Sequence, residues 1–229
     1  MDPITILETR ERILAEQNAD GDKLRGELTD RRVFFVNVMA SPGAGKTTLL
    51  VRTIRALTEQ GYRVGVMEAD VDSAVDAETV RRETQARVIQ LHTGGSCHMD
   101  ADMTARGIDR FGVEDLDVLF LENVGNLVCP AEFDVGAHLK VMLLSVPEGD
   151  DKPLKYPLMF EVSDILLINK IDTAPVFDFD FAACEERARK RNPEMEIHRL
   201  SALTGDGFDS WVAALTDRIR AFQAETAHP

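Results

Sequence analysis

From residue 33 onward, short runs of apolar and β-branched residues alternate with longer stretches of amphipathic pattern. Several of the short runs are apolar throughout, which is typical of parallel strands that are covered on both faces. The alternation predicts a three-layer α/β sandwich with a mostly parallel sheet. The predicted strands are Val33–Met39, Arg63–Glu68, Ala86–Leu91, Leu116–Glu122, Lys140–Val146, Ile165–Asn169 and Glu196–Leu200, and the predicted helices lie near 46–60, 74–85, 97–110, 180–191 and 208–225.

The segment before the first predicted strand has a different pattern. Residues 5–28 place apolar side chains at helical spacing among many charges, and the run Asp20-Gly21-Asp22 is expected to break that helix. We therefore expect a helical extension over residues 1–32, followed by a single α/β domain over residues 33–229.

Composition argues against some classes of binding partner and indicates a cellular compartment. The formal net charge of -14 disfavours binding to nucleic acid or to an anionic membrane surface. No stretch resembles a membrane span, and Met1-Asp2-Pro3-Ile4 does not begin a secretory signal. Three cysteines without an export signal argue against a disulfide framework, so the expected compartment is the cytoplasm.

A glycine-rich turn joins the first predicted strand to the first predicted helix of this domain. Its sequence from Ser41 to Leu50 is typical of a loop whose backbone N–H groups wrap a polyphosphate at a helix N-terminus. Lys46 is expected to reach the β- and γ-phosphates, and the Thr47 hydroxyl to ligate Mg²⁺. The other nucleotide-binding candidates in the loop are Gly43, Ala44, Gly45 and Thr48.

The phosphate loop departs from its usual pattern at one position. Where such loops open with glycine, this chain has Ala40. If that position required a positive φ, alanine would cost about 1 kcal/mol, so the chain is expected to leave the strand there in an ordinary conformation.

Two later segments favour guanine as the base. Asn169-Lys170-Ile171-Asp172 follows a buried strand, and a carboxylate at Asp172 can accept hydrogen bonds from the ring N–H and the exocyclic amine of guanine. Asn169 is expected to tie this turn to the phosphate loop, and Lys170 to lie against the base. After the last strand, a backbone N–H near Ser201 and Ala202 is placed to meet the guanine carbonyl oxygen. The other interpretation of Asp172 is a turn cap.

Carboxylates follow two more of the predicted strands. Glu122 ends the strand before Val124-Gly125 and is expected near Mg²⁺ or its waters, with Gly125 facing the γ-phosphate. The run from Glu68 to Ser73 and the later Asp76 supply further acids, among which Asp72 and Asp76 are favoured for orienting water. Asp and Ser at a helix start are equally ordinary caps. Because no glutamine occupies a familiar water-orienting position, we expect slow intrinsic hydrolysis. The catalytic candidates are thus Lys46, Asp72, Asp76 and Glu122.

A soft metal-ligand set is suggested by two cysteines and a histidine. Cys97 and His98 follow a strand and a glycine turn, at an expected helix N-terminus, and Cys129 lies four residues past Gly125. Two thiolates and one imidazole suit Zn²⁺ or Ni²⁺ better than Mg²⁺. Taken alone, the same residues are also compatible with a chance Cys-His dipeptide and core cysteines.

Over nearly its whole length the sequence resembles the HypB family, the GTPases that assist nickel insertion into [NiFe]-hydrogenase. The motifs that carry the resemblance are residues 41–50, 97–101, 122–130, 144–157 and 169–172. The resemblance implies that Cys97, His98 and Cys129 bind zinc or nickel at the interface of a GTP-dependent homodimer. It also implies two partners, a small zinc-containing nickel accessory protein and the hydrogenase large-subunit precursor.

The sequence departs from parts of that family. No cysteine precedes Cys97, and the 5 histidines are not clustered, so high-affinity nickel storage is not expected. The related urease nickel GTPase carries a Cys-Pro-His motif that this chain lacks, and it is the second choice. Two other classes stay open, namely an ATP-dependent P-loop kinase or ligase with structural cysteines, and a nucleotide-switched scaffold with redox-sensing thiols.

Overall fold

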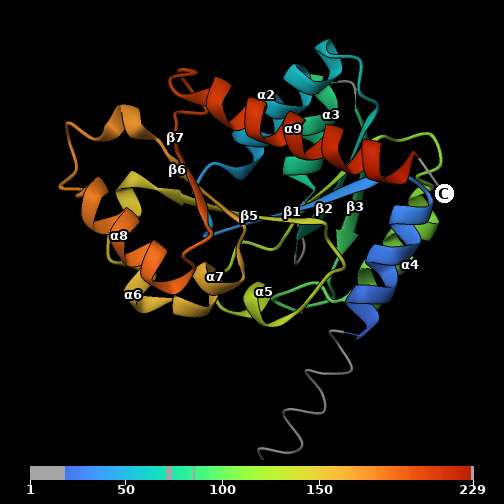
Figure 1. The fold of residues 1–229 in the computed structure, drawn as a ribbon, viewed down its shortest axis with the longest axis horizontal. Coiled ribbons are helices and arrows are strands. Elements are labelled where there is room, and N and C mark those ends of the chain that lie inside the picture. Colours follow the sequence, from blue (N-terminus) through green and yellow to red (C-terminus); the bar gives the residue numbers. More distant parts are fainter. Residues whose placement is uncertain (1–18, 71–73, 85, 228–229) are drawn as a thin grey trace, which may run out of the picture.

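The computed structural model describes residues 19–70, 74–84 and 86–227 of the chain. Within these residues a seven-stranded sheet forms the central layer, and every strand pair in it is parallel. The strand order is β3-β2-β4-β1-β5-β6-β7 (Figure 1). The strands are β1 (Phe34–Ala40), β2 (Val64–Asp70), β3 (Arg87–His92), β4 (Val118–Glu122), β5 (Leu139–Ser145), β6 (Ile165–Asn169) and β7 (Glu196–Arg199).

The apolar runs form strands because both faces of the sheet are covered. In β1, Val36 and Val38 pack into the core on one face, whereas Phe35 packs into the core on the other. All seven residues of β1 are buried. The three-layer α/β fold and the position of each predicted strand are confirmed, with ends that differ by at most two residues.

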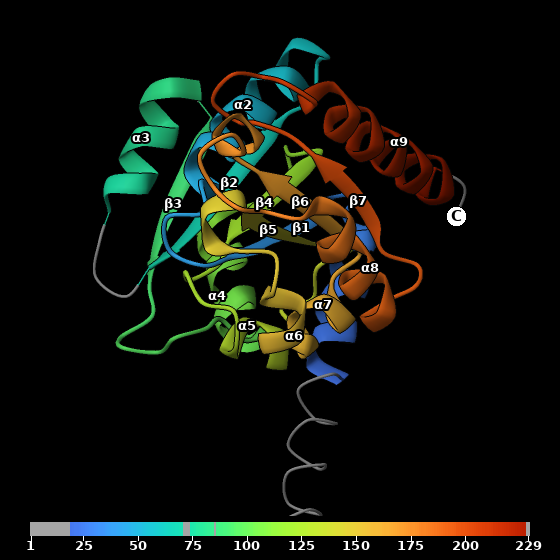
Figure 2. The same ribbon diagram turned by 90° about the vertical axis from the view of Figure 1, so that its left-hand side faces the viewer.

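Helices cover the two faces of the sheet in separate groups (Figure 2). One face carries α2 (Lys46–Glu59), α3 (Val75–Thr84) and α9 (Phe208–Thr226). The other face carries α4 (Ala101–Phe111), α8 (Phe181–Arg191) and the helix over residues 19–30. No helix among the described residues is both long and apolar enough to span a membrane.

Several short elements were not predicted. They are α5 (Cys129–Glu132), α6 (Lys152–Lys155), α7 (Pro157–Val162) and the 3₁₀ turns η1 (Val146–Glu148) and η2 (Ile171–Thr173). Pro130, Pro153 and Pro157 stand in the first turns of α5, α6 and α7, where the missing N–H of proline is tolerated. Elements of three to six residues are too short to show a helical period in the sequence.

The expected helix break at Asp20-Gly21-Asp22 is wrong, because all three residues lie inside the helix over 19–30. A Cβ atom at Gly21 would lie 2.7 Å from Cγ of Asp134. The glycine therefore allows the helix to approach the segment after α5, which a larger residue would prevent. The part of the expected helix before residue 19 lies outside the described residues.

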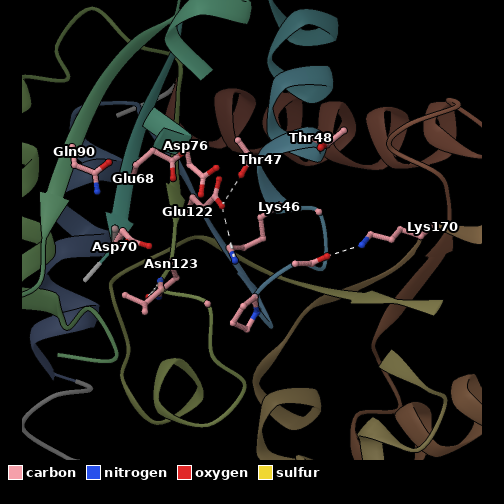
Figure 3. A pocket seen from close by; sticks show the side chains of 16 residues that line it. Lys46, Thr47, Thr48, Glu68, Asp70, Asp76, Gln90, Glu122, Asn123 and Lys170 are labelled. Atoms are coloured by element: carbon pink, nitrogen blue, oxygen red, sulfur yellow. Dashed lines mark hydrogen bonds and ion pairs between the residues drawn. The ribbon is translucent and has the colours of Figure 1, made fainter. Parts of the chain in front are cut away.

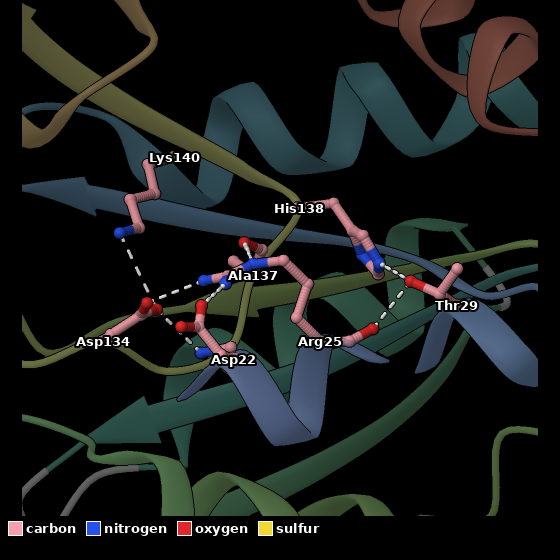
Figure 4. A network of polar contacts seen from close by, with 8 residues as sticks. Asp22, Arg25, Thr29, Asp134, Ala137, His138 and Lys140 are labelled. Atoms are coloured by element: carbon pink, nitrogen blue, oxygen red, sulfur yellow. Dashed lines mark hydrogen bonds and ion pairs between the residues drawn. The ribbon is translucent and has the colours of Figure 1, made fainter. Parts of the chain in front are cut away.

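Polar contacts fix this N-terminal helix to the sheet (Figure 4). Arg25 donates to the Ala137 carbonyl at 2.8 Å and to Asp134 Oδ2 at 2.7 Å. Thr29 Oγ1 lies 3.0 Å from His138 Nε2, and the backbone N–H of Phe35 donates to His138 Nδ1 at 3.0 Å. With Leu24 and Leu28 buried beneath it, the helix packs as part of the layer on that face.

Candidate nucleotide and metal sites

The candidate residues gather where parallel strands end. β1 lies between β4 and β5, neither of which is its neighbour in sequence, so the loops after β1 and β4 emerge side by side. In open α/β sheets such a crevice at the carboxyl ends of the strands is the usual ligand site. A cavity of about 570 Å³ occupies it. Its lining includes Gly43, Gly45, Lys46, Thr47, Thr48, Glu68, Asp76, Gln90, Glu122 and Lys170 (Figure 3).

The phosphate loop has the backbone that its glycines permit. Gly43 and Gly45 adopt φ values of 75° and 103°, and α2 begins at Lys46. Ala40 ends β1 without a positive φ, so the expectation of an ordinary conformation there is confirmed. Lys46 and Thr47 thus stand in the first turn of a helix whose start lines the cavity, an arrangement suited to a phosphate chain.

The Asn169 side chain joins three loops. Its Nδ2 donates to the Ala44 carbonyl at 2.9 Å, and its Oδ1 accepts from the Ala202 N–H at 2.9 Å. The predicted tie between Asn169 and the phosphate loop is confirmed. The Ala202 N–H is engaged by Asn169, so Ala202 supports the turn and does not offer that N–H to a base. A Cβ at Gly45 would lie 2.7 Å from Asn169 Nδ2, which explains why glycine stands there.

The rest of the base-binding turn is open. Lys170, at φ 60°, donates from Nζ to the Gly43 carbonyl at 2.6 Å and so lies across the phosphate loop. Asp172 is exposed in η2 and makes no hydrogen bond within the described part of the chain. Ser201 is buried, and its Oγ accepts from the Thr204 N–H at 3.1 Å. Asp172 is therefore free to meet a ligand, whereas Ser201 shapes the loop.

Glu122 faces the start of α2. Thr47 donates to its Oε1 at 3.3 Å, and Lys46 Nζ lies 4.0 Å from the same oxygen. The Glu122 side chain is almost wholly buried, and its Oε2 has no partner among the described residues. Carboxylate and hydroxyl oxygens beside a phosphate loop are the donor set that Mg²⁺ prefers. The residues present therefore fit that cation, with Thr47 and Glu122 as candidate ligands.

The predictions for the other acidic residues are met only in part. Asp72 lies outside the described residues, and Asp76 is an exposed residue in the first turn of α3 that lines the cavity. Glu68, which the sequence favoured less, is buried beside Glu122. Burial raises the pKa of both carboxyl groups, and the charge of Glu122 raises the pKa of Glu68 further. Gln90 also lines the cavity, although the sequence pointed to no glutamine.

Cys97, His98 and Cys129 come together in space, as expected. Their potential ligand atoms lie within 4.8 Å of one another. Cys97 Sγ is 2.7 Å from Cys129 Sγ and 3.8 Å from His98 Nδ1. Cys97 is exposed and the other two are partly buried, so an incoming ion can reach all three. The third cysteine, Cys184, is buried in α8, and burial raises its pKa to about 12.

The local setting of these ligands differs from the expectation in one respect. Cys97 and His98 precede α4, which begins at Ala101 after its N-cap Asp100, so Cys97 is not at a helix N-terminus. Its contact with Cys129 raises the Cys97 pKa. The His98 ring stacks on Phe133 at 3.6 Å between centroids, and desolvation lowers its pKa, which favours the neutral form that binds metals.

Asn126, which the sequence did not single out, connects the two sites. Its backbone N–H donates to the Ala40 carbonyl at 2.9 Å, at the start of the phosphate loop. Its side chain donates to the Cys97 carbonyl at 3.3 Å and accepts from the Val128 N–H at 2.8 Å. One residue thus contacts the phosphate loop, the Cys97 loop and the residue before Cys129.

Comparison with known proteins agrees with this geometry. Residues 34–199 match the family model described as "CobW/HypB/UreG, nucleotide-binding domain". The chain is 43% identical over 207 residues to the hydrogenase maturation factor HypB of Escherichia coli K12, covering 90% of this chain and 71% of that protein. The chain belongs to the HypB family. It is also 35% identical over 206 residues to the probable HypB of Methanocaldococcus jannaschii, covering 90% of this chain and 92% of that protein.

Solved HypB structures have the same fold. HypB from Helicobacter pylori, crystallised in complex with nickel, superposes with a TM-score of 0.84 at 33% identity, covering 90% of this chain and 96% of that chain. HypB from Archaeoglobus fulgidus gives a TM-score of 0.82 at 36% identity, covering 90% of this chain and 99% of that chain. The chain therefore carries the nucleotide-binding P-loop domain of a family of hydrogenase maturation factors.

Proposed function

We propose that this HypB-family protein is a metal-binding GTPase that couples GTP binding and hydrolysis to nickel delivery during [NiFe]-hydrogenase maturation. The observation that carries the proposal is the continuity of residues 122–129, which begin at Glu122, beside Thr47 of the phosphate loop, and end at Cys129. The nickel complex of the Helicobacter pylori relative supports nickel as the cargo.

The contacts along this segment supply the coupling. A Cβ at Gly125 would lie 3.2 Å from Pro42, so the segment packs closely on the phosphate loop. Asn126 then joins Ala40 to Cys97 and Val128. A γ-phosphate that displaces Gly125 or Pro42 must also move Asn126, and with it the loops that hold both thiols. Such a movement of the metal-binding side chains changes metal affinity only if the nucleotide-bound and nucleotide-free proteins bind the metal differently.

On the nucleotide side, each residue has a proposed role. Lys46 and the N–H groups from Gly43 to Thr48 would bind the phosphates, and Asp172 would select guanine. Mg²⁺, held by Thr47 and Glu122, would neutralise charge on the phosphates. Asp76, in the first turn of α3, and Asp72, which lies outside the described residues, are proposed to orient the attacking water.

On the metal side, Cys97, His98 and Cys129 would hold Ni²⁺ as cargo, or Zn²⁺ in its place. Three ligands from one chain leave room for ligands from another molecule. We propose a GTP-dependent homodimer formed around this exposed site. The proposed partners are a small zinc-containing nickel accessory protein and the hydrogenase large-subunit precursor.

The test is a titration of Ni²⁺ and Zn²⁺ with and without a non-hydrolysable GTP analogue, using wild type, Cys129→Ala and Asn126→Ala. In wild type, the GTP analogue is expected to change both the metal affinity and the dimer fraction. Cys129→Ala should lose metal binding, because it removes a thiolate ligand. Asn126→Ala should still bind both the metal and the nucleotide. The nucleotide should, however, change its metal affinity less than in wild type. Leu154→Ala, an exposed residue of α6 outside this segment, is the control.

Two results would contradict the proposal, one for the delivery mechanism and one for guanine selection. If wild-type metal affinity and dimer fraction ignore the nucleotide, the delivery mechanism is wrong. If ATP competes as well as GTP for the site, guanine selection by Asp172 is wrong, and an ATP-dependent enzyme becomes the better account.

A further inference from the structure

Three polar side chains form a row across neighbouring strands at the deep end of the nucleotide cavity. The strand register pairs Gln90 on β3 with Glu68 on β2, and Glu68 with Glu122 on β4. Directly paired residues of parallel strands point to the same face, about 4.8 Å apart. All three line the cavity, and Figure 3 shows Gln90, Glu68 and Glu122 in that order toward Thr47.

Each member of this row has a buried polar atom with no hydrogen-bond partner among the described residues. The atoms are Gln90 Nε2, Glu68 Oε1 and Glu122 Oε2. Glu68 and Glu122 are only 3% and 4% exposed. The Glu68 and Glu122 side chains also hydrogen-bond to each other, yet these three atoms stay unpaired. Buried polar groups are nearly always satisfied, so three such atoms on adjacent strands indicate a missing ligand.

The chemistry of the row identifies the class of that ligand. Two adjacent carboxyl groups ionise together only beside positive charge, and Lys46 Nζ lies 4.0 Å from Glu122 Oε1. Glu122 and Thr47 already fit a divalent cation, whereas Glu68 stands one strand farther from the phosphate loop. A hydrated divalent ion keeps several waters, and those waters need acceptors beyond the direct ligands.

We propose that Glu68 and Gln90 are positioning residues that hold the coordinated waters of the divalent cation bound by Thr47 and Glu122. Glu68 accepts hydrogen bonds from these waters, and the Gln90 amide donates to Glu68 or to a water beside it. This inference rests on the proposed nucleotide and cation site. It adds two residues to that site that bind neither the nucleotide nor the cation directly.

The experiment measures Mn²⁺ binding to the protein–GDP complex by electron paramagnetic resonance, with GDP affinity measured separately in EDTA. The variants are Glu68→Gln, which keeps the shape of the side chain, and Gln90→Met. Loss of such outer partners weakens metal binding about tenfold or more, so Glu68→Gln should raise the Mn²⁺ dissociation constant by about tenfold. Gln90→Met should raise it less. Glu59→Gln, an exposed carboxylate at the end of α2, is the matched control and should change nothing.

GDP affinity in EDTA should be the same for all the variants. The inference is overturned if Glu68→Gln and Gln90→Met bind Mn²⁺ as tightly as wild type. It is also overturned if they weaken GDP binding equally with and without Mn²⁺, since that would indicate general damage to the cavity. Failure of wild type itself to bind GDP, or to bind Mn²⁺ with GDP, would instead refute the proposed function. Thermal unfolding checks the fold, and Gln90→Met retains the test if Glu68→Gln does not fold.

Discussion

At the scale of single residues, the turn after β6 contains both a side chain bonded within the protein and one that is exposed. Asn169 is buried and uses both ends of its amide within the protein. Asp172, three residues later, is exposed, and the described residues offer it no hydrogen-bond partner. Substitutions at these two positions should therefore have different effects, although both lie in the same motif.

Asp172→Asn should lower affinity for guanine nucleotides by about 100-fold, because two hydrogen bonds to a charged acceptor are lost or weakened. It should raise relative affinity for xanthine nucleotides, whose base presents an acceptor at that edge, and leave thermal stability unchanged. Competition binding with GDP and XDP measures both. Asp178→Asn, an exposed acid in the following loop, is the control. Equal GDP affinity in Asp172→Asn and wild type would contradict guanine recognition by this carboxylate.

His138 should make stability depend on pH. Its Nδ1 accepts from the Phe35 N–H, so the proton of the neutral ring is on Nε2 and faces Thr29 Oγ1. Burial, helped by the charge of Arg25, lowers its pKa to about 4. The unfolded chain, with a pKa near 6.5, binds more protons between these values, so the free energy of unfolding should fall as pH falls from about 6.5 to about 4.

The decrease in the free energy of unfolding has an upper limit of about 3 kcal/mol. It should be smaller than that limit because the His138 ring is partly exposed. Urea unfolding at several pH values measures it, and His138→Gln should lose that part of the pH dependence. His92→Gln, an exposed histidine at the end of β3, should keep the wild-type slope. An unchanged slope in His138→Gln would mean that other groups cause the pH dependence.

At the scale of elements, the Arg25 guanidinium contributes to the attachment of the helix over residues 19–30 to the rest of the protein. Arg25→Met should keep the packing of the stem but leave Asp134 with Lys140, 3.7 Å away, and the backbone N–H of Gly136. We expect a loss of about 1–3 kcal/mol in the free energy of unfolding, because a mostly buried carboxylate loses a charged hydrogen bond. Lys23→Met, on the exposed side of the same helix, should have little effect in the same urea titration. Equal stabilities would show that the apolar contacts alone hold the helix.

The sequence predicted the elements whose burial leaves a pattern. β4 to β6 are apolar runs because both faces are covered, so their positions were readable. Helix α5 was not, because a single turn beginning at Cys129 shows no period. Gly21 was misinterpreted because a glycine that allows close approach has the same sequence signature as one that breaks a helix.

The site was predicted where spacing along the chain determines geometry. The phosphate loop and the turn at Asn169 are local motifs, and they are found as expected. Glu68, Gln90 and Asn126 lie beside residues of other strands and loops, and a short sequence motif does not reveal the strand order that brings them together. Glu68 becomes a candidate only when β2 is known to pair with β4.

At the scale of the whole molecule, the nucleotide cavity and the thiol–imidazole set share the segment after β4, so the two binding reactions should be linked. If the GTP analogue raises Ni²⁺ affinity by some factor, Ni²⁺ must raise affinity for the analogue by the same factor. Two titrations, one for each ligand in saturating amounts of the other, measure the two factors in wild type. Cys184→Ala, a buried cysteine in α8 away from the site, should preserve the equality and the factor. Unequal factors would show that an unmeasured step, such as dimerisation, differs between the titrations.

The strand order also has a consequence for synthesis of the protein. β1, which ends at Ala40, is held by β4 and β5, and the latter ends at Ser145. A ribosome that has made the phosphate motif must therefore make about a hundred further residues before that motif has neighbours on both sides. Nucleotide cannot template the early stages of folding, and a nascent chain interrupted before β5 would expose an unprotected apolar strand to other chains.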